Sequence, residues 1–164
     1  MSIKSLKNFI INGFNTIKSS NDLTHENKVE SIGYLFGIGS LIGILPGWRP
    51  KAISHNALLL FIENKFMLPK GLERAHELHR RDTFDQLINN NWKSDEEWWQ
   101  FYYERDFTIL STRSENRDER NFHQIKKYKV PLDENLFQGK RVGFVYKEKE
   151  KEFLIKLAKE NNLI

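Results

Sequence analysis

The chain has 164 residues, and its 26 Lys or Arg against 22 Asp or Glu give a formal net charge of +4 with neutral histidines. Hydrophobic residues make up 39% of the sequence and aromatic residues 13%, which excludes a disordered chain and is enough for a packed core. The absence of cysteine excludes disulfides, thiolate metal sites and cysteine nucleophiles, and it fits a reducing cytoplasm, where we expect the protein. The mildly basic charge permits a polyanion as partner.

Apolar residues recur with helical spacing from residue 3 to residue 18, which predicts an amphipathic helix with one buried face. A polar loop follows, and Asp22 or Thr24 is placed to cap the next helix. The uncharged stretch 31–48 contains five glycines and is shorter than the roughly 20 apolar residues of a membrane span. It predicts a buried helix, with a membrane segment or a glycine-rich loop as alternatives.

The rest of the chain shows helical patterns and two short strand patterns. Helices are expected from Pro50 to the residue before Pro69, over 70–82, from Ser94 through Tyr102 and over 148–161, and strands over 107–111 and 141–146. A capping box at Thr112 and Glu115 predicts a helix directly after the first of these strands. The sequence therefore predicts a mostly helical α+β single domain, in which residues 1–69 are helical, residues 70–125 are a candidate active-site segment, and residues 126–164 hold a strand and the C-terminal helix.

The segment 73–82 places two histidines, three carboxylates and three arginines within ten residues. A charge cluster of this kind is either a solvated helix face or one half of a functional site. The second half would come from residues 106–117, where a carboxylate precedes a strand and an amide lies in the first turns of the following helix. A helix N-terminus attracts anions, and oxygen ligands suit magnesium.

Arg74-Ala75-His76, followed by the segment from Asp106 to Asn116, resembles the HNH endonucleases, also called ββα-metal or His-Me finger nucleases. The resemblance implies a degenerate ββα-metal element and hydrolysis of phosphodiester bonds in DNA or RNA with Mg²⁺ or another divalent metal. It implies that His76 is the general base and that His79 is a spare base or ligand. Asp106 would occupy the central catalytic position and also ligate the metal, and Asn116 would be a second metal ligand.

Arginines in both segments are expected to contact nucleic-acid phosphates. These candidates are Arg74, Arg80, Arg81, Arg113, Arg117 and Arg120. A second hypothesis is a non-catalytic module that binds nucleic acid or protein, of the inhibitor or immunity type. A third is a membrane-associated protein held by residues 31–48.

Overall fold

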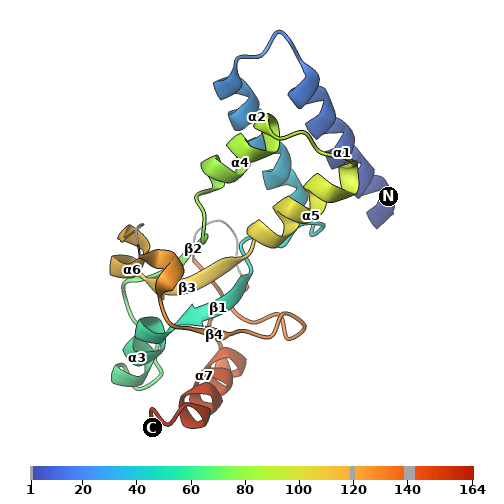
Figure 1. Cartoon of the computed structure of the whole chain (residues 1–164). Coiled ribbons are helices and arrows are strands. Elements are labelled where there is room, and N and C mark those ends of the chain that lie inside the picture. The colour runs from blue at the N-terminus through green and yellow to red at the C-terminus, as the bar shows by residue number, and fades with distance from the viewer. Residues whose placement is uncertain (1, 119–120, 139–142) are drawn as a thin grey trace. The chain divides into compact units, whose positions relative to one another are not determined.

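The computed structural model describes residues 2–118, 121–138 and 143–164, and these form seven α-helices, one 3₁₀ helix and a four-stranded mixed sheet (Figure 1). The mostly helical α+β prediction is confirmed. In chain order the elements are α1 (Ile3–Ser19), α2 (His25–Leu41), β1 (Pro50–Ser54), α3 (His55–Glu63), β2 (Leu72–Ala75), α4 (Arg80–Asn89), α5 (Asp95–Arg105), β3 (Thr108–Thr112), α6 (Arg113–Arg117), η1 (Phe122–Gln124), β4 (Lys127–Lys129) and α7 (Glu148–Glu160).

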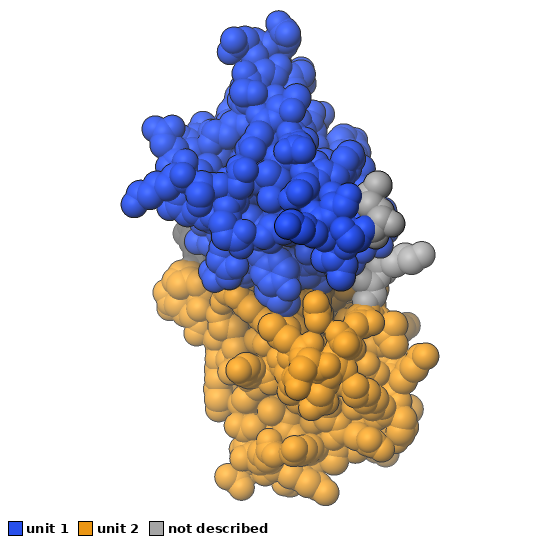
Figure 2. Space-filling view, turned by 90° about the vertical axis from the view of Figure 1, so that its right-hand side faces the viewer, with its two compact units in different colours: residues 1–47, 78–107 blue, residues 48–77, 108–164 orange. Residues whose placement is uncertain are grey.

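The chain divides into two compact units, coloured separately in Figure 2. Unit 1 contains residues 1–47 and 78–107, and unit 2 contains residues 48–77 and 108–164. The second segment of unit 1 therefore interrupts unit 2 between its strands β2 and β3. These boundaries differ from the three segments expected from the sequence, and the expectation of a single domain stays a prediction.

Unit 1 is built from α1, α2, α4 and α5 around an aromatic core. Phe36 lies at its centre, with ring centroids 4.1 Å from Tyr102, 5.9 Å from Phe84, 6.1 Å from Phe14 and 6.2 Å from Trp98. Aromatic rings at these spacings combine large buried area with favourable edge and offset contacts. The rings of Trp98, Trp99 and Tyr102 are thus part of the core rather than an exposed stacking surface.

The uncharged stretch 31–48 is helical only as far as Leu41, the last residue of α2. The helix begins earlier than that stretch, at His25, and Thr24 caps it by accepting a hydrogen bond from Asn27 N. Close packing by Leu45 accounts for one glycine of this stretch, because a Cβ added at Gly39 would lie 2.7 Å from Leu45 Cδ1. Among the described residues, none of the helices has both the length and the apolar character needed to cross a membrane.

Unit 2 contains the sheet, whose strand order is β2-β3-β1-β4. β3 pairs antiparallel with β2 and parallel with β1, and β4 pairs antiparallel with β1. Ile53 and Leu110 face the side covered by α3 and α7, which lie together in Figure 1. Ala52 and Ile109 face the other side, where Phe122 of η1 packs.

Three local expectations are wrong. Pro50 opens strand β1 instead of a helix, and the helix starts only at His55. Within the predicted helix 70–82, residues 72–75 form β2, because pairing with β3 overrides the helical pattern of an isolated segment. Residues 143–146 form no strand, and Arg141 and Val142 of that predicted strand lie outside the described residues.

Replacing Phe36, which is 0% exposed, by alanine is expected to cost about 3–5 kcal/mol of unfolding free energy, because it leaves a cavity among four rings. The matched control is Phe9→Ala on α1, where the side chain is 54% exposed and the expected cost is below about 1 kcal/mol. Urea denaturation followed by tryptophan fluorescence measures both. Equal losses for the two variants would contradict this description of the core.

Candidate active site

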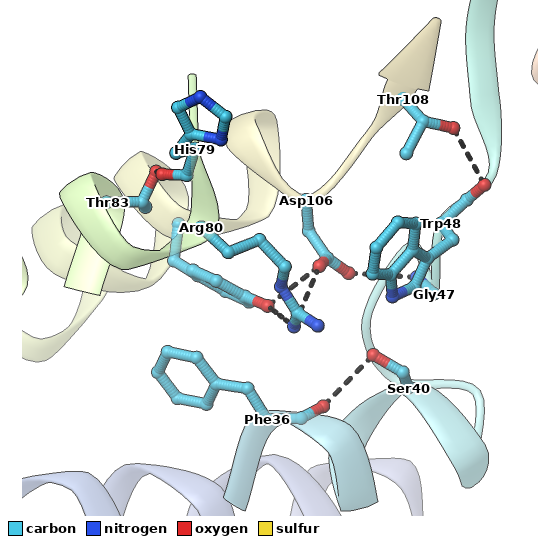
Figure 3. Close-up of polar contacts among 10 residues, drawn as sticks. Phe36, Ser40, Gly47, Trp48, His79, Arg80, Thr83, Asp106 and Thr108 are labelled. Carbon is cyan, nitrogen blue, oxygen red and sulfur yellow. Dashed lines mark hydrogen bonds and ion pairs between the residues drawn. The ribbon is translucent and has the colours of Figure 1, made fainter. Parts of the chain in front are cut away.

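His76 is the first residue after strand β2. Its half-buried ring packs edge-on against the Trp48 indole, with centroids 4.4 Å apart and planes at 73°, and its Nε2 is buried. The Trp48 carbonyl accepts hydrogen bonds from Thr108 Oγ1 at 2.8 Å (Figure 3) and from Arg74 at 3.1 Å. The backbone before β1 is thus fixed to β2 and β3, and it carries the indole that orients His76.

Strand β3 runs directly into α6, as its capping box predicts. Thr112 accepts a hydrogen bond from Glu115 N, and the Glu115 carboxylate accepts one from Thr112 N at 3.0 Å. The same carboxylate accepts a 2.6 Å hydrogen bond from the fully buried hydroxyl of Ser54, at the end of β1. A polar contact between buried groups therefore holds α6 against the sheet.

Asn116 is brought next to β2 by this docking. Its Nδ2 donates to Glu73 Oε2 at 2.8 Å, and Arg113 Nε donates to Glu73 Oε1 at 2.7 Å. The hydrogen bonds from Asn116 and Arg113 hold the pKa of Glu73 below its ordinary value. Arg113 and Asn116 of α6 thus both donate to the ionised carboxylate of Glu73 on β2, which lies about 40 positions earlier in the sequence.

Glu77 lies one residue beyond His76 and contacts two lysines from other strands. Lys51 Nζ is 2.8 Å from Glu77 Oε2, and Lys127 Nζ donates to Glu77 Oε1. Burial raises the pKa of Glu77, but the hydrogen bonds from Lys127 and Lys51 outweigh it and leave the pKa below its ordinary value. One carboxylate between two ammonium groups leaves a net positive charge at Glu77, the residue that follows His76 in the sequence.

Asp106 lies elsewhere, in unit 1, and its side chain is only 1% exposed. Its carboxylate accepts hydrogen bonds from Tyr102 at 2.7 Å and from Gly47 N at 2.9 Å, and it pairs with Arg80 at 3.4 Å (Figure 3). Burial raises the pKa of Asp106, against the opposing effects of these three partners. The expected assembly of Asp106 with Asn116 as metal ligands finds no support in these contacts, which join α4, α5 and the turn before β1 inside unit 1.

The other expected site residues are dispersed. His79 is exposed and occupies the N-cap position of α4. Arg74 is buried, which lowers the pKa of its guanidinium, and Arg81 pairs with Glu26 in unit 1. Arg117 is exposed on α6, and Arg120 lies outside the described residues. Six arginines were expected to bind phosphate. Among the described ones, Arg113 and Arg117 lie in unit 2, and both are exposed on α6.

The side chains of Glu73 and Asn116 carry oxygen atoms, which are the donors that a divalent cation such as Mg²⁺ takes. Within the residues that the structure describes, His, Asp and Glu form no group of three or more that could hold a metal ion. Both carboxylate oxygens of Glu73 accept hydrogen bonds, from Arg113 Nε at 2.7 Å and from Asn116 Nδ2 at 2.8 Å, so this contact docks α6 on β2. Sequence reasoning did not select Glu73, because its partners lie 40 and 43 positions away and only the strand pairing brings them together.

Comparison with known proteins adds no family. The chain matches no protein-family model, and neither a curated protein nor a solved structure shows significant similarity to it.

The contacts of Asp106 predict a structural role that mutation can test. Asp106→Ala leaves Arg80 and the Tyr102 hydroxyl without their buried partner and is expected to cost about 3–5 kcal/mol of unfolding free energy. The control, Asp22→Ala in an exposed loop of unit 1, should stay within about 0.5 kcal/mol of wild type. Urea denaturation measures both, and wild-type stability in Asp106→Ala would refute the structural role.

The lowered pKa of Glu73 predicts a pH-dependent effect of Glu73→Gln. A depressed pKa stabilises the fold above the ordinary glutamate value of 4.5, and this contribution disappears as the pH falls through the folded-state pKa. Glu73→Gln should therefore cost about 1 kcal/mol or less at neutral pH and almost nothing in acid. Thermal melts of wild type and Glu73→Gln from neutral to acidic pH measure this cost. A cost that grows toward acidic pH would contradict the hydrogen bonds as the cause of the lowered pKa of Glu73.

Proposed function

We propose that this chain is a metal-dependent nuclease that hydrolyses phosphodiester bonds, with His76 as the general base. The observation that carries the proposal is the order of elements around His76. Strand β2 ends directly before this histidine, β2 pairs antiparallel with β3, and β3 continues without a break into the helix that carries Asn116. Two antiparallel strands followed by a helix are the arrangement that the HNH resemblance implies.

The long interval between the two strands is consistent with this proposal. Residues 78–107 belong to unit 1 and carry helices α4 and α5, so they form an insertion between paired strands. A turn between antiparallel strands accepts such an insertion when the strands keep their register, as Glu73–Ser111 and Ala75–Ile109 do. The pairing of β2 with β3 is therefore retained although about 30 residues separate them.

The cationic side chains of unit 2 suit a phosphodiester. Lys51 and Lys127 share Glu77 on one side, and Arg113 and Arg117 lie on α6. In the proposed mechanism the neutral imidazole of His76 removes a proton from the attacking water, and the Trp48 indole holds the ring in place. A bound divalent cation would stabilise negative charge on the phosphate and the leaving oxygen. Asp106 has no part in this mechanism.

A plasmid-nicking assay tests the proposal. The purified chain is expected to convert supercoiled DNA to nicked circles with Mg²⁺ or Mn²⁺ and to lose this activity in EDTA. His76→Ala should lower the rate by about 100-fold or more, because a general base contributes at least that much. The matched control is His123→Ala on η1, whose exposed side chain lies outside the proposed mechanism and whose loss should leave the rate unchanged.

Each alternative gives a different result in the same assay. Equal nicking by wild type and His76→Ala would refute the assignment of the base. Salt-sensitive binding of DNA without cleavage, in any metal, would favour the non-catalytic binding module. A structured RNA tested in parallel distinguishes the two nucleic acids as substrates.

A further inference from the structure

Helix α2 of unit 1 carries an apolar stripe on its outer side. Tyr34 is 71% exposed, Ile38 44%, Leu41 77% and the C-cap residue Ile42 40%. These residues follow one another at steps of three and four positions, so they lie on one side of the helix. The opposite side is buried, and Phe36 projects from it into the aromatic core. The four residues, here called the α2 stripe, form a contiguous exposed patch of the kind that marks an interaction site.

The α2 stripe lies in a stretch without charge. Residues 31–48 contain no Asp, Glu, Lys, Arg or His, although charged residues make up 29% of the chain. Nucleic acid requires Lys or Arg to neutralise its phosphates, and helices that lie on membranes carry these residues on their polar face, beside the apolar one. Residues 31–48 supply neither. The α2 stripe therefore fits an apolar, uncharged surface of a protein chain.

The spacing of the α2 stripe makes it self-complementary. Tyr34 and Ile42 lie four positions before and four positions after Ile38. Two copies of α2 that pack antiparallel about a two-fold axis near Ile38 place this residue beside its own copy, and they place Tyr34 of each chain beside Ile42 of the other. Rows of residues at i±4 are also the ridges that interdigitate in the commonest class of helix packing.

The charged residue next to the α2 stripe stays far from its copy in such a pair. Glu30 lies one helical turn before Tyr34 and eight positions before Ile38. At 1.5 Å per residue this is roughly 12 Å from the axis, so the two Glu30 residues are roughly 24 Å apart. That separation exceeds the Debye length of about 8 Å at physiological ionic strength. Repulsion between these carboxylates therefore does not oppose burial of the apolar side chains.

We infer that the α2 stripe is the interface of a homodimer, in which two copies of this chain pack α2 against α2 about a two-fold axis near Ile38. A second copy presents the same uncharged apolar ridge and so matches the patch in both charge and shape. Four apolar residues a side are fewer than the about 20–30 residues of a standard protein interface. The dimer is therefore expected to be weak, with a dissociation constant of roughly 1–100 µM.

Sedimentation equilibrium of the full chain tests the dimer. From low to high micromolar concentration, the average mass of wild type should rise from that of the monomer toward twice that value. Leu41→Lys should weaken dimerisation by roughly 10-fold or more, because it places a charge in an apolar contact. This side chain is 77% exposed and lies outside the core. The matched control is Met67→Lys in unit 2, 61% exposed, which should sediment as wild type does.

Complementary charges distinguish a second copy from any other partner. Ile38→Lys and Ile38→Glu should each be monomeric, because like charges then meet at the two-fold axis. An equimolar mixture of the two variants should associate again, because the ammonium group of one chain faces the carboxylate of the other. Circular dichroism of each variant checks that α2 is retained.

Wild type that stays monomeric at high micromolar concentration would overturn the homodimer. Dimerisation of Leu41→Lys as tight as that of wild type, or a mixture of the two Ile38 variants that fails to associate, would overturn it as well. Flotation of monomeric wild type with phosphatidylcholine–phosphatidylserine vesicles, lost in Leu41→Lys, would assign the α2 stripe to a membrane surface instead. Sedimentation needs no nucleic acid, so these results are independent of the proposed nuclease activity.

Discussion

The hydrogen bond between Ser54 and Glu115 fixes the arrangement on which the rest of unit 2 depends. Helix α6 has five residues, and a helix of that length has no stability of its own in water. Its place is therefore set by contacts with the sheet. Ser54 ends β1, caps α3 through Ala57 N and donates to α6, so one buried hydroxyl joins three elements. Asn116 lies over β2 because Glu115, one residue earlier, is held in this way.

The charges near His76 are arranged in compensated groups. Glu73 is shared by Arg113 and Asn116, and Glu77 is shared by two lysines from β1 and β4. Each carboxylate lies on one side of His76 in the sequence, and each is kept ionised by partners from other elements. The cations outnumber the two carboxylates by one, which suits an anionic substrate such as a phosphodiester and agrees with the proposed nuclease.

The second segment of unit 1, residues 78–107, lies between β2 and β3 in the chain, so residues close together in the sequence there can belong to different units. Asp106 lies two residues before β3, yet its contacts with Tyr102, Arg80 and Gly47 place it in the polar network of unit 1. Asp106 and Asn116 are ten positions apart, but they belong to different units. Glu73, 43 positions from Asn116, is its hydrogen-bond partner.

The sequence by itself determined the α+β class, α1, β3 and the capping box of α6, and it narrowed the cap of α2 to Asp22 or Thr24, because hydrophobic periodicity and local caps depend on neighbours within a few residues. Only the tertiary structure decided that residues 72–75 are a strand, that Asp106 is buried and that Glu73 meets Asn116. Strand pairing and contacts between distant elements carry no periodic signal. They depend on which distant segments the fold brings together, because buried polar groups need hydrogen-bond partners and those partners come from other elements.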